Sequence, residues 1–170
     1  MSTFYLIENI FTNKERKDLI EKSKPFLVDL DYFPGRQSIA NLAFDNDFRF
    51  HHERILRSIK EKTGLKFLFT RSWVNWSNGK KEDLAWHTHP APGNPPCDFT
   101  GVYYMQTLPF FNNGTLFRPP IGFVKAPQNS LLMFPPYLEH TAPTCPFPID
   151  RYAFAVEMVY ANGGGIWMNS

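Results

Sequence analysis

The sequence has no long hydrophobic run and no strong excess of either charge. Its apolar runs, such as "SLLMF" at 130–134, are far shorter than the roughly 20 residues that a membrane-spanning helix needs. The formal net charge is only +2, and the basic residues are scattered, which argues against a nucleic-acid groove. The N-terminus lacks a cleavable signal pattern. We therefore expect a cytoplasmic protein with no membrane or nucleic-acid partner; the oligomeric state stays open.

Cysteine is scarce as well. The chain contains only Cys97 and Cys145, and both lie in proline-rich segments. A lone pair of cysteines in a protein without secretory features is weak support for a disulfide. We predict two free thiols.

Aromatic residues and prolines are abundant. They amount to 16% of the chain and 15 residues respectively, a composition typical of an aromatic-packed β-domain with many interrupted strands. The length of 170 residues fits one domain spanning 1–170. We expect helical support over about 1–64 and a β core over about 66–160.

Two helices are predicted in the first third of the chain. The segment "TNKE" at 12–15 is typical of a capping box, in which Thr12 and Glu15 satisfy the first amides of a helix over about 13–23. Apolar residues at helical spacing predict a second helix over 48–62, which ends at "TGL". Residues 4–11 resemble a short strand.

After Gly64 the sequence consists of short segments separated by turn residues. This pattern predicts an antiparallel sandwich or barrel, so the fold class should be mainly β. The predicted strands cover residues 66–77, 85–89, 99–106, 114–118, 121–125, 130–134 and 151–160.

Two of the five histidines stand at alternate positions, His87 and His89. On a strand, residues two apart point to the same face, so both imidazoles could hold one ion. A third candidate is His140, which a β-barrel could bring to the same mouth. Imidazole suits iron, zinc, copper or nickel. A chance surface pair is the alternative, since His51 and His52 form another close pair with no evident chemistry.

Four elements around these histidines occur in a familiar order: "HTHP" at 87–90, "VYY" at 102–104, "FPPYLEH" at 134–140, and Arg151 eleven residues after His140. This order resembles the 2-oxoglutarate- and Fe(II)-dependent oxygenase superfamily. The similarity is to its prolyl-hydroxylase-like branch, including small phage and bacterial members with HxHP in place of HxD. The resemblance covers about residues 66–160.

The resemblance implies a double-stranded β-helix, or jelly roll, supported by N-terminal helices. It also implies a dioxygenase that hydroxylates an unidentified substrate and releases succinate and CO₂ from 2-oxoglutarate. The substrate would be a small molecule or a protein side chain. The implied cofactors are Fe(II) and the cosubstrate 2-oxoglutarate.

The resemblance further implies that His87, His89 and His140 bind the iron. The usual set in this family is two histidines and one carboxylate. Here a histidine stands at the carboxylate position, so the site carries one more positive charge. Three flanking residues could supply a carboxylate instead, although each is more typical of a solvated loop charge: Glu82, Asp83 and Asp98.

Arg151 is the expected partner of the far carboxylate of 2-oxoglutarate. A planar guanidinium offers two charge-assisted hydrogen bonds to a carboxylate. Alternation along "RYAFAVE" places Arg151, Ala153 and Ala155 on one face, which leaves room for a small dicarboxylate. The alternative is a solvent-facing arginine at a strand edge, with the opposite face of the strand filling the core.

Three more residues are candidates for the cosubstrate site. Tyr104 matches the second tyrosine of the family's "YY" strand, and Thr100 shares its face. A buried tyrosine bonded to backbone is the alternative for Tyr104. Asn75 is a polar residue between Val74 and Trp76, and we expect it to contact 2-oxoglutarate or substrate.

Two other functions remain possible at this stage. A three-histidine, cupin-like dioxygenase would oxidise its substrate without 2-oxoglutarate and would need no arginine opposite the metal. A non-catalytic metal-binding jelly roll would fit the altered ligand set. Arg151 favours the 2-oxoglutarate-dependent enzyme.

Overall fold

The computed structural model describes residues 4–79, 85–108, 113–143 and 147–161, and most of them lie in antiparallel strands. The large sheet has the strand order β1 (Tyr5–Glu8), β8 (Ser130–Phe134), β5 (Phe99–Gln106), β10 (Asp150–Tyr160), β4 (Phe67–Asn78), β3 (Arg36–Ser38) and β2 (Leu27–Asp29). The small sheet has the order β7 (Phe123–Lys125), β6 (Gly114–Phe117) and β9 (His140–Thr141). The predicted mainly β fold is confirmed.

Both predicted helices are confirmed. Helix α1 (Asn13–Ser23) begins at the capping box, in which Thr12 N donates to Glu15 Oε2 at 2.7 Å and Glu15 N donates to Thr12 Oγ1 at 3.3 Å. Helix α2 (Arg49–Thr63) ends at Gly64, whose left-handed φ of 75° suits glycine. Short 3-10 turns flank the helices: η1 (Lys24–Phe26), η2 (Leu42–Phe44) and η3 (Asn46–Phe48). Among the described residues, no helix combines the length and the apolar character needed to span a bilayer.

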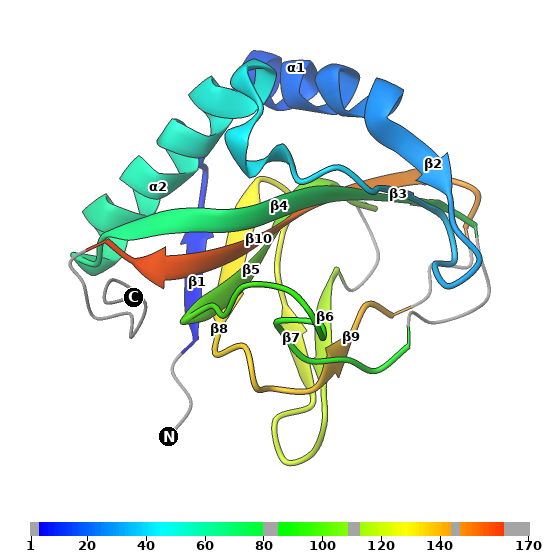
Figure 1. Cartoon of the computed structure of the whole chain (residues 1–170). Coiled ribbons are helices and arrows are strands. Elements are labelled where there is room, and N and C mark those ends of the chain that lie inside the picture. The colour runs from blue at the N-terminus through cyan, green and yellow to red at the C-terminus, as the bar shows by residue number, and fades with distance from the viewer. Residues whose placement is uncertain (1–3, 80–84, 109–112, 144–146, 162–170) are drawn as a thin grey trace.

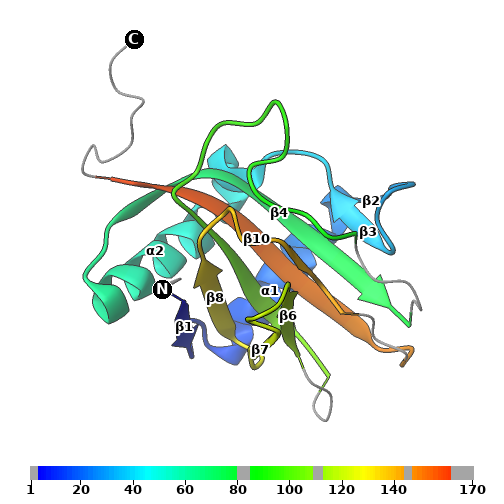
Figure 2. The same ribbon diagram turned by 90° about the horizontal axis from the view of Figure 1, so that it is seen from below.

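The helices and the small sheet lie on opposite faces of the large sheet (Figures 1 and 2). The main core lies on the helix side, where Leu19 of α1 and Ile55 of α2 are fully buried in one cluster with Tyr103 and Phe154 of the large sheet. A smaller apolar cluster lies between the two sheets and includes Phe117. The helix-covered face therefore supplies most of the apolar burial, while the other face can carry polar groups.

The predicted strand at 85–89 is wrong. This segment forms a single antiparallel bridge, in which the backbone amides of His87 and His140 each donate to the other residue's carbonyl at 3.0 Å. His89 N donates instead to Pro136 O at 2.8 Å, and Pro90 has no N–H with which to continue a ladder. The bridged partner, β9, was not predicted because two residues are too short for a periodic pattern.

The other predicted strands are confirmed to within two residues at each end. Residues 4–11 contain β1, as expected. The agreement extends to the β10 pairings, which place this strand between β4 and β5 in the large sheet. The strand carrying Arg151 is therefore central rather than at an edge.

Cys97 is a free, partly buried thiol. Burial raises the pKa of this thiol to about 12, with smaller contributions from nearby carboxylates. It therefore stays protonated and is a weak nucleophile at neutral pH. Cys145 lies outside the described residues.

Candidate metal centre

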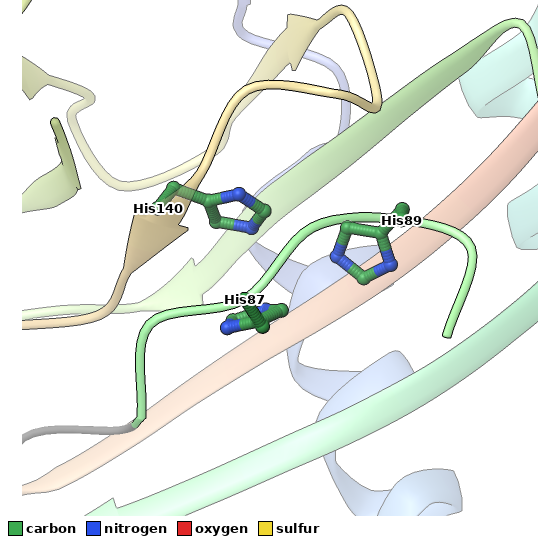
Figure 3. Close-up of side chains that lie close together, drawn as sticks. All are labelled: His87, His89 and His140. Carbon is green, nitrogen blue, oxygen red and sulfur yellow. The ribbon is translucent and has the colours of Figure 1, made fainter. Parts of the chain in front are cut away.

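Three imidazoles converge where the 85–89 segment meets β9 (Figure 3). One nitrogen from each of His87, His89 and His140 lies within 4.8 Å of the other two, and this is the sole such group within the described ranges. The ring centroids are 4.3 Å apart for His87 and His140, 5.1 Å for His87 and His89, and 5.2 Å for His89 and His140. The backbone bridge between His87 and His140 holds the two segments together.

Hydrogen bonds define which nitrogen of each ring is available to a metal. His87 Nδ1 lies 2.8 Å from Ala85 O, and His140 Nδ1 lies 2.8 Å from Leu138 O. A backbone carbonyl can only accept, so both Nδ1 atoms carry the proton. His89 Nδ1 lies 2.8 Å from Glu157 Oε1 and donates in the same way to a carboxylate. The lone pair of each ring is therefore on Nε2.

Burial keeps His87 and His140 neutral. It lowers the pKa of His140 to about 3, with a further contribution from the neighbouring His87. Burial also lowers the pKa of His87. A metal does not have to displace a proton from a neutral imidazole. Three imidazole nitrogen donors on one face suit a divalent first-row transition metal and leave further coordination positions open.

Of the three flanking carboxylates, only Asp98 lies within the described residues. Its Oδ2 accepts a hydrogen bond from Tyr160 N at 2.8 Å, and it is not part of the histidine group. Glu82 and Asp83 lie outside the described residues. The carboxylate beside the centre is Glu157, which we did not predict. The strand alternation from Arg151 to Ala155 continues to Glu157, so the sequence pattern indicates that Glu157 lies on the same face of the strand as Arg151.

The centre opens into a cavity of about 560 Å³ between the two sheets. All seven predicted site residues line this cavity: Asn75, His87, His89, Thr100, Tyr104, His140 and Arg151. The structure therefore brings together residues from β4, β5, β9, β10 and the 85–89 segment. Their roles remain predictions.

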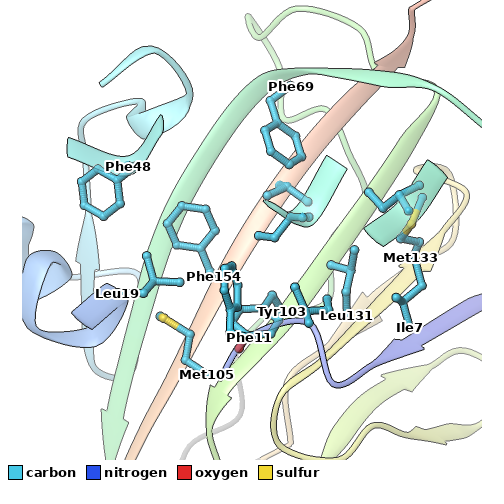
Figure 4. Packing of buried hydrophobic residues seen from close by; sticks show 14 of the residues in the cluster. Ile7, Phe11, Leu19, Phe48, Phe69, Tyr103, Met105, Leu131, Met133 and Phe154 are labelled. Carbon is cyan, nitrogen blue, oxygen red and sulfur yellow. The ribbon is translucent and has the colours of Figure 1, made fainter. Parts of the chain in front are cut away.

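Arg151 lines the cavity together with Ala153 and Ala155. Its Nη1 donates to Pro143 O at 3.0 Å, and it forms no ion pair with any Asp or Glu in the part of the chain that the structure describes. The opposite face of β10 fills the core, as Phe154 shows in Figure 4. One face of β10 thus lines the cavity and the other packs in the core. Within the described residues, the charge of Arg151 has no acidic partner.

Tyr104 lines the cavity from the adjacent strand. Its hydroxyl lies 2.6 Å from Thr115 Oγ1, and burial raises its pKa to about 12. The hydroxyl therefore remains a donor at neutral pH. Tyr103 points the other way, into the core shown in Figure 4, where its hydroxyl donates to Asn129 Oδ1 at 2.8 Å.

Asn75 and Thr100 already have partners. Asn75 Oδ1 accepts from Gln37 Nε2 at 2.6 Å, so the group it can still offer a ligand is its amide N–H₂. Thr100 Oγ1 donates to Val156 O at 3.0 Å, which leaves this hydroxyl as an acceptor only. Sequence reasoning missed Gln37 and Thr115, because their places in the cavity depend on pairings between distant strands.

No protein-family model and no curated protein matches the sequence, but solved structures match the fold. HygX from Streptomyces hygroscopicus, with nickel, 2-oxoglutarate and hygromycin B bound, superposes with a TM-score of 0.66 at 12% identity, over 95% of this chain and 84% of that one. A prolyl hydroxylase from Trichoplax adhaerens, in complex with a hypoxia inducible factor peptide fragment, gives 0.66 at 15% identity, over 92% and 83%. The non-heme α-ketoglutarate-dependent epimerase SnoN from nogalamycin biosynthesis gives 0.70 at 12% identity, over 94% and 78%.

These likenesses establish the fold of the chain. It is the double-stranded β-helix of the 2-oxoglutarate and Fe(II) oxygenases, including prolyl hydroxylases. The predicted structural resemblance to this superfamily is confirmed. Because fold alone does not fix function, activity has to be argued from the site.

Proposed function

We propose that this chain is a 2-oxoglutarate- and Fe(II)-dependent dioxygenase that hydroxylates its substrate and releases succinate and CO₂. One observation carries the proposal: three imidazoles with Nε2 lone pairs line the same cavity as an arginine that has no carboxylate partner among the described residues. The fold supports it, as does HygX, a protein of this fold with nickel and 2-oxoglutarate bound.

His87, His89 and His140 would hold the iron, which when bound supplies oxygen activation coupled to decarboxylation of 2-oxoglutarate. The protein's part is to present three imidazole donors in fixed orientations. Each Nδ1–H is held by an acceptor at 2.8 Å, so the rings are oriented before a metal arrives.

Arg151 would bind the far carboxylate of 2-oxoglutarate. Its charge has no Asp or Glu partner among the described residues, and the adjacent Ala153 and Ala155 leave space beside it. Tyr104, protonated at neutral pH, would donate a second hydrogen bond to the same carboxylate. Arginine and a neutral phenol together favour a dianion over a neutral keto compound.

The cavity can hold more than the cosubstrate. At about 560 Å³ it lies in the range of pockets that enclose drug-sized ligands, whereas 2-oxoglutarate is a five-carbon acid. We propose that the remaining volume takes a small molecule or a protein side chain. The solved relatives include one with an antibiotic bound and one with a peptide bound.

Anaerobic titration with Fe(II) and 2-oxoglutarate tests the proposal. We expect a weak visible charge-transfer band that needs both components and is absent from His140→Ala. A three-histidine dioxygenase would bind Fe(II) without this band and would consume oxygen with its own substrate alone. A metal-binding module would bind Fe(II) and show neither signal. Bound Fe(II) with no band at saturating 2-oxoglutarate would contradict the proposal.

A further inference from the structure

Glu157 is a fully buried carboxylate beside the metal centre. Its Oε1 accepts the hydrogen bond of His89 Nδ1 at 2.8 Å. Its Oε2 has no hydrogen-bond partner in the part of the chain that the structure describes, and it lies 3.6 Å from Arg71 Nη1. An isolated buried carboxylate is costly, so a carboxylate at this position must be compensated by its neighbours.

The strand register places Glu157 at this point. On β10 it is paired with Arg71 of β4 and with Thr100 of β5, so it lies in the middle of the large sheet. It follows Arg151, Ala153 and Ala155 on the cavity side of the strand. One strand thus carries a cationic group near one end of the cavity and an anionic group behind the metal centre.

The three histidines differ in what holds their Nδ1 atoms. His87 and His140 donate to backbone carbonyls, which carry no net charge. His89 alone donates to a carboxylate. His89 is also the residue at the position where the family has a carboxylate ligand. A carboxylate behind a ligating imidazole makes its other nitrogen a stronger donor.

The net charge of the metal centre depends on its ligands. A divalent ion with three neutral imidazoles keeps its full +2 charge, whereas a carboxylate ligand would reduce it to +1. Arg71 adds a further positive charge nearby, because its Nη1 lies within 4 Å of Glu157. Among the described residues, Glu157 is the acidic residue whose side chain contacts this histidine cluster.

We propose that Glu157 is a positioning residue that returns to the metal centre, through His89, the negative charge missing from the three-histidine ligand set. The inference rests on the metal centre of the proposed function, but not on 2-oxoglutarate or on any particular substrate. If Glu157 served only as the ion-pair partner of Arg71, it would influence folding stability without a specific effect on metal binding.

Metal affinity of the full chain, measured with Co(II) and Zn(II) in competition with a chelator, tests this without turnover. Glu157→Gln keeps the size and an acceptor oxygen for His89 and removes the charge. We expect this variant to bind both ions about 10- to 100-fold more weakly and to show a shifted visible Co(II) spectrum. Circular dichroism and thermal unfolding of the metal-free protein verify that the variant is folded.

Arg71→Gln is the matched control. It breaks the same ion pair but removes a positive charge, so Co(II) affinity should stay unchanged or rise. A purely structural ion pair predicts that the two variants behave alike. Equal affinities in Glu157→Gln and Arg71→Gln, whether both fall or both stay at the wild-type value, would therefore overturn the proposal. If Glu157→Gln does not fold, a loss of Co(II) affinity in Arg71→Gln would still contradict it.

The His89→Asp background gives a test of sign. With a carboxylate at position 89, Glu157 becomes a like charge beside it. Glu157→Gln should then leave Co(II) affinity unchanged or raise it, the reverse of its effect with His89 present. The same loss in both backgrounds would show that Glu157 does not act through His89. Failure of the wild type to bind either ion would instead refute the metal centre itself.

Discussion

Two pairs of neighbouring histidines stand in this chain, and they lie in very different surroundings. His51 and His52 are buried on α2, whereas His87 and His89 lie between the two sheets. In both regions burial lowers histidine pKa values. Low pKa and close spacing are therefore common to both pairs and do not identify the metal centre.

The nitrogen that is engaged distinguishes the two regions. In the helix pair, Nε2 of His51 lies 3.3 Å from Glu15 O and Nε2 of His52 lies 3.0 Å from Ser72 Oγ, so the outer nitrogens are tied to the fold. In the metal centre the Nδ1 atoms are engaged instead, which leaves the Nε2 atoms for a metal, and one nitrogen of each ring lies within 4.8 Å of the other two. The ring nitrogen that the fold leaves available is therefore a better criterion for a metal site than close spacing or a low pKa.

The largest effect should come from His140→Ala. It removes one of three proposed ligands. The loss of Fe(II) or Co(II) affinity should therefore exceed the loss of about 10- to 100-fold that is typical when a hydrogen-bond partner of a ligand is removed. The matched change in the other region, His52→Gln, should leave metal content intact. Metal analysis after loading and desalting measures both. Unchanged stoichiometry in His140→Ala would remove this residue from the site.

Arg151→Ala should weaken the binding of 2-oxoglutarate by about 2 to 4 kcal/mol, because it deletes one partner of a partly buried charge pair. Metal affinity should change little. Calorimetric titration of the Ni(II)-loaded protein with 2-oxoglutarate gives the number. Arg118→Ala is the control, since this exposed arginine pairs with Glu139. Equal affinity in Arg151→Ala and the wild type would exclude Arg151 from the cosubstrate site.

The helix pair should make stability depend on pH. Burial lowers the pKa of His52 from 6.5 to about 4, so between these values the unfolded chain binds more protons than the folded one. The contribution of neutral His52 to the free energy of unfolding is therefore complete above pH 6.5, and it is lost as the pH falls toward 4. Urea unfolding at pH 7 and pH 5 should differ by about 2 kcal/mol more in the wild type than in His52→Gln. Equal differences would show that His52 does not titrate in this way.

His89→Asp should have the smallest effect. It restores the family's usual ligand set and lowers the charge of the site by one, so iron should stay bound, with comparable or greater turnover of 2-oxoglutarate. Succinate formed per enzyme in air with excess ascorbate is the readout, with His89→Ala measured in parallel. Full metal content and full turnover in His89→Ala would mean that His89 is not a ligand.

The sequence was sufficient wherever a local pattern decides the structure. The capping box at Thr12, the left-handed end at Gly64 and the alternation along β10 each depend on neighbouring residues, and the structure has all three. The family resemblance added the expectation of a jelly roll, because it relates motifs that are far apart in the chain. Placing His140 beside His87 required that information.

Contacts between distant segments were out of reach of sequence reasoning. The bridge between His87 and His140 involves one residue on each side, too few for any periodicity. Glu157 lies 68 residues after His89 in the sequence, so the segments that flank the histidines do not point to it. Only the pairing of β10 with β4 and β5 brings residue 157 behind residue 89.

A crystal structure of the anaerobic protein with Ni(II) and 2-oxoglutarate would test the central claim most directly. We expect anomalous density for one ion bound by Nε2 of His87, His89 and His140, with the Nδ1 of His89 still donating to Glu157. We also expect 2-oxoglutarate on the ion, with its far carboxylate on Arg151 and Tyr104. An ion held by other residues, or a keto acid bound away from Arg151, would contradict the account.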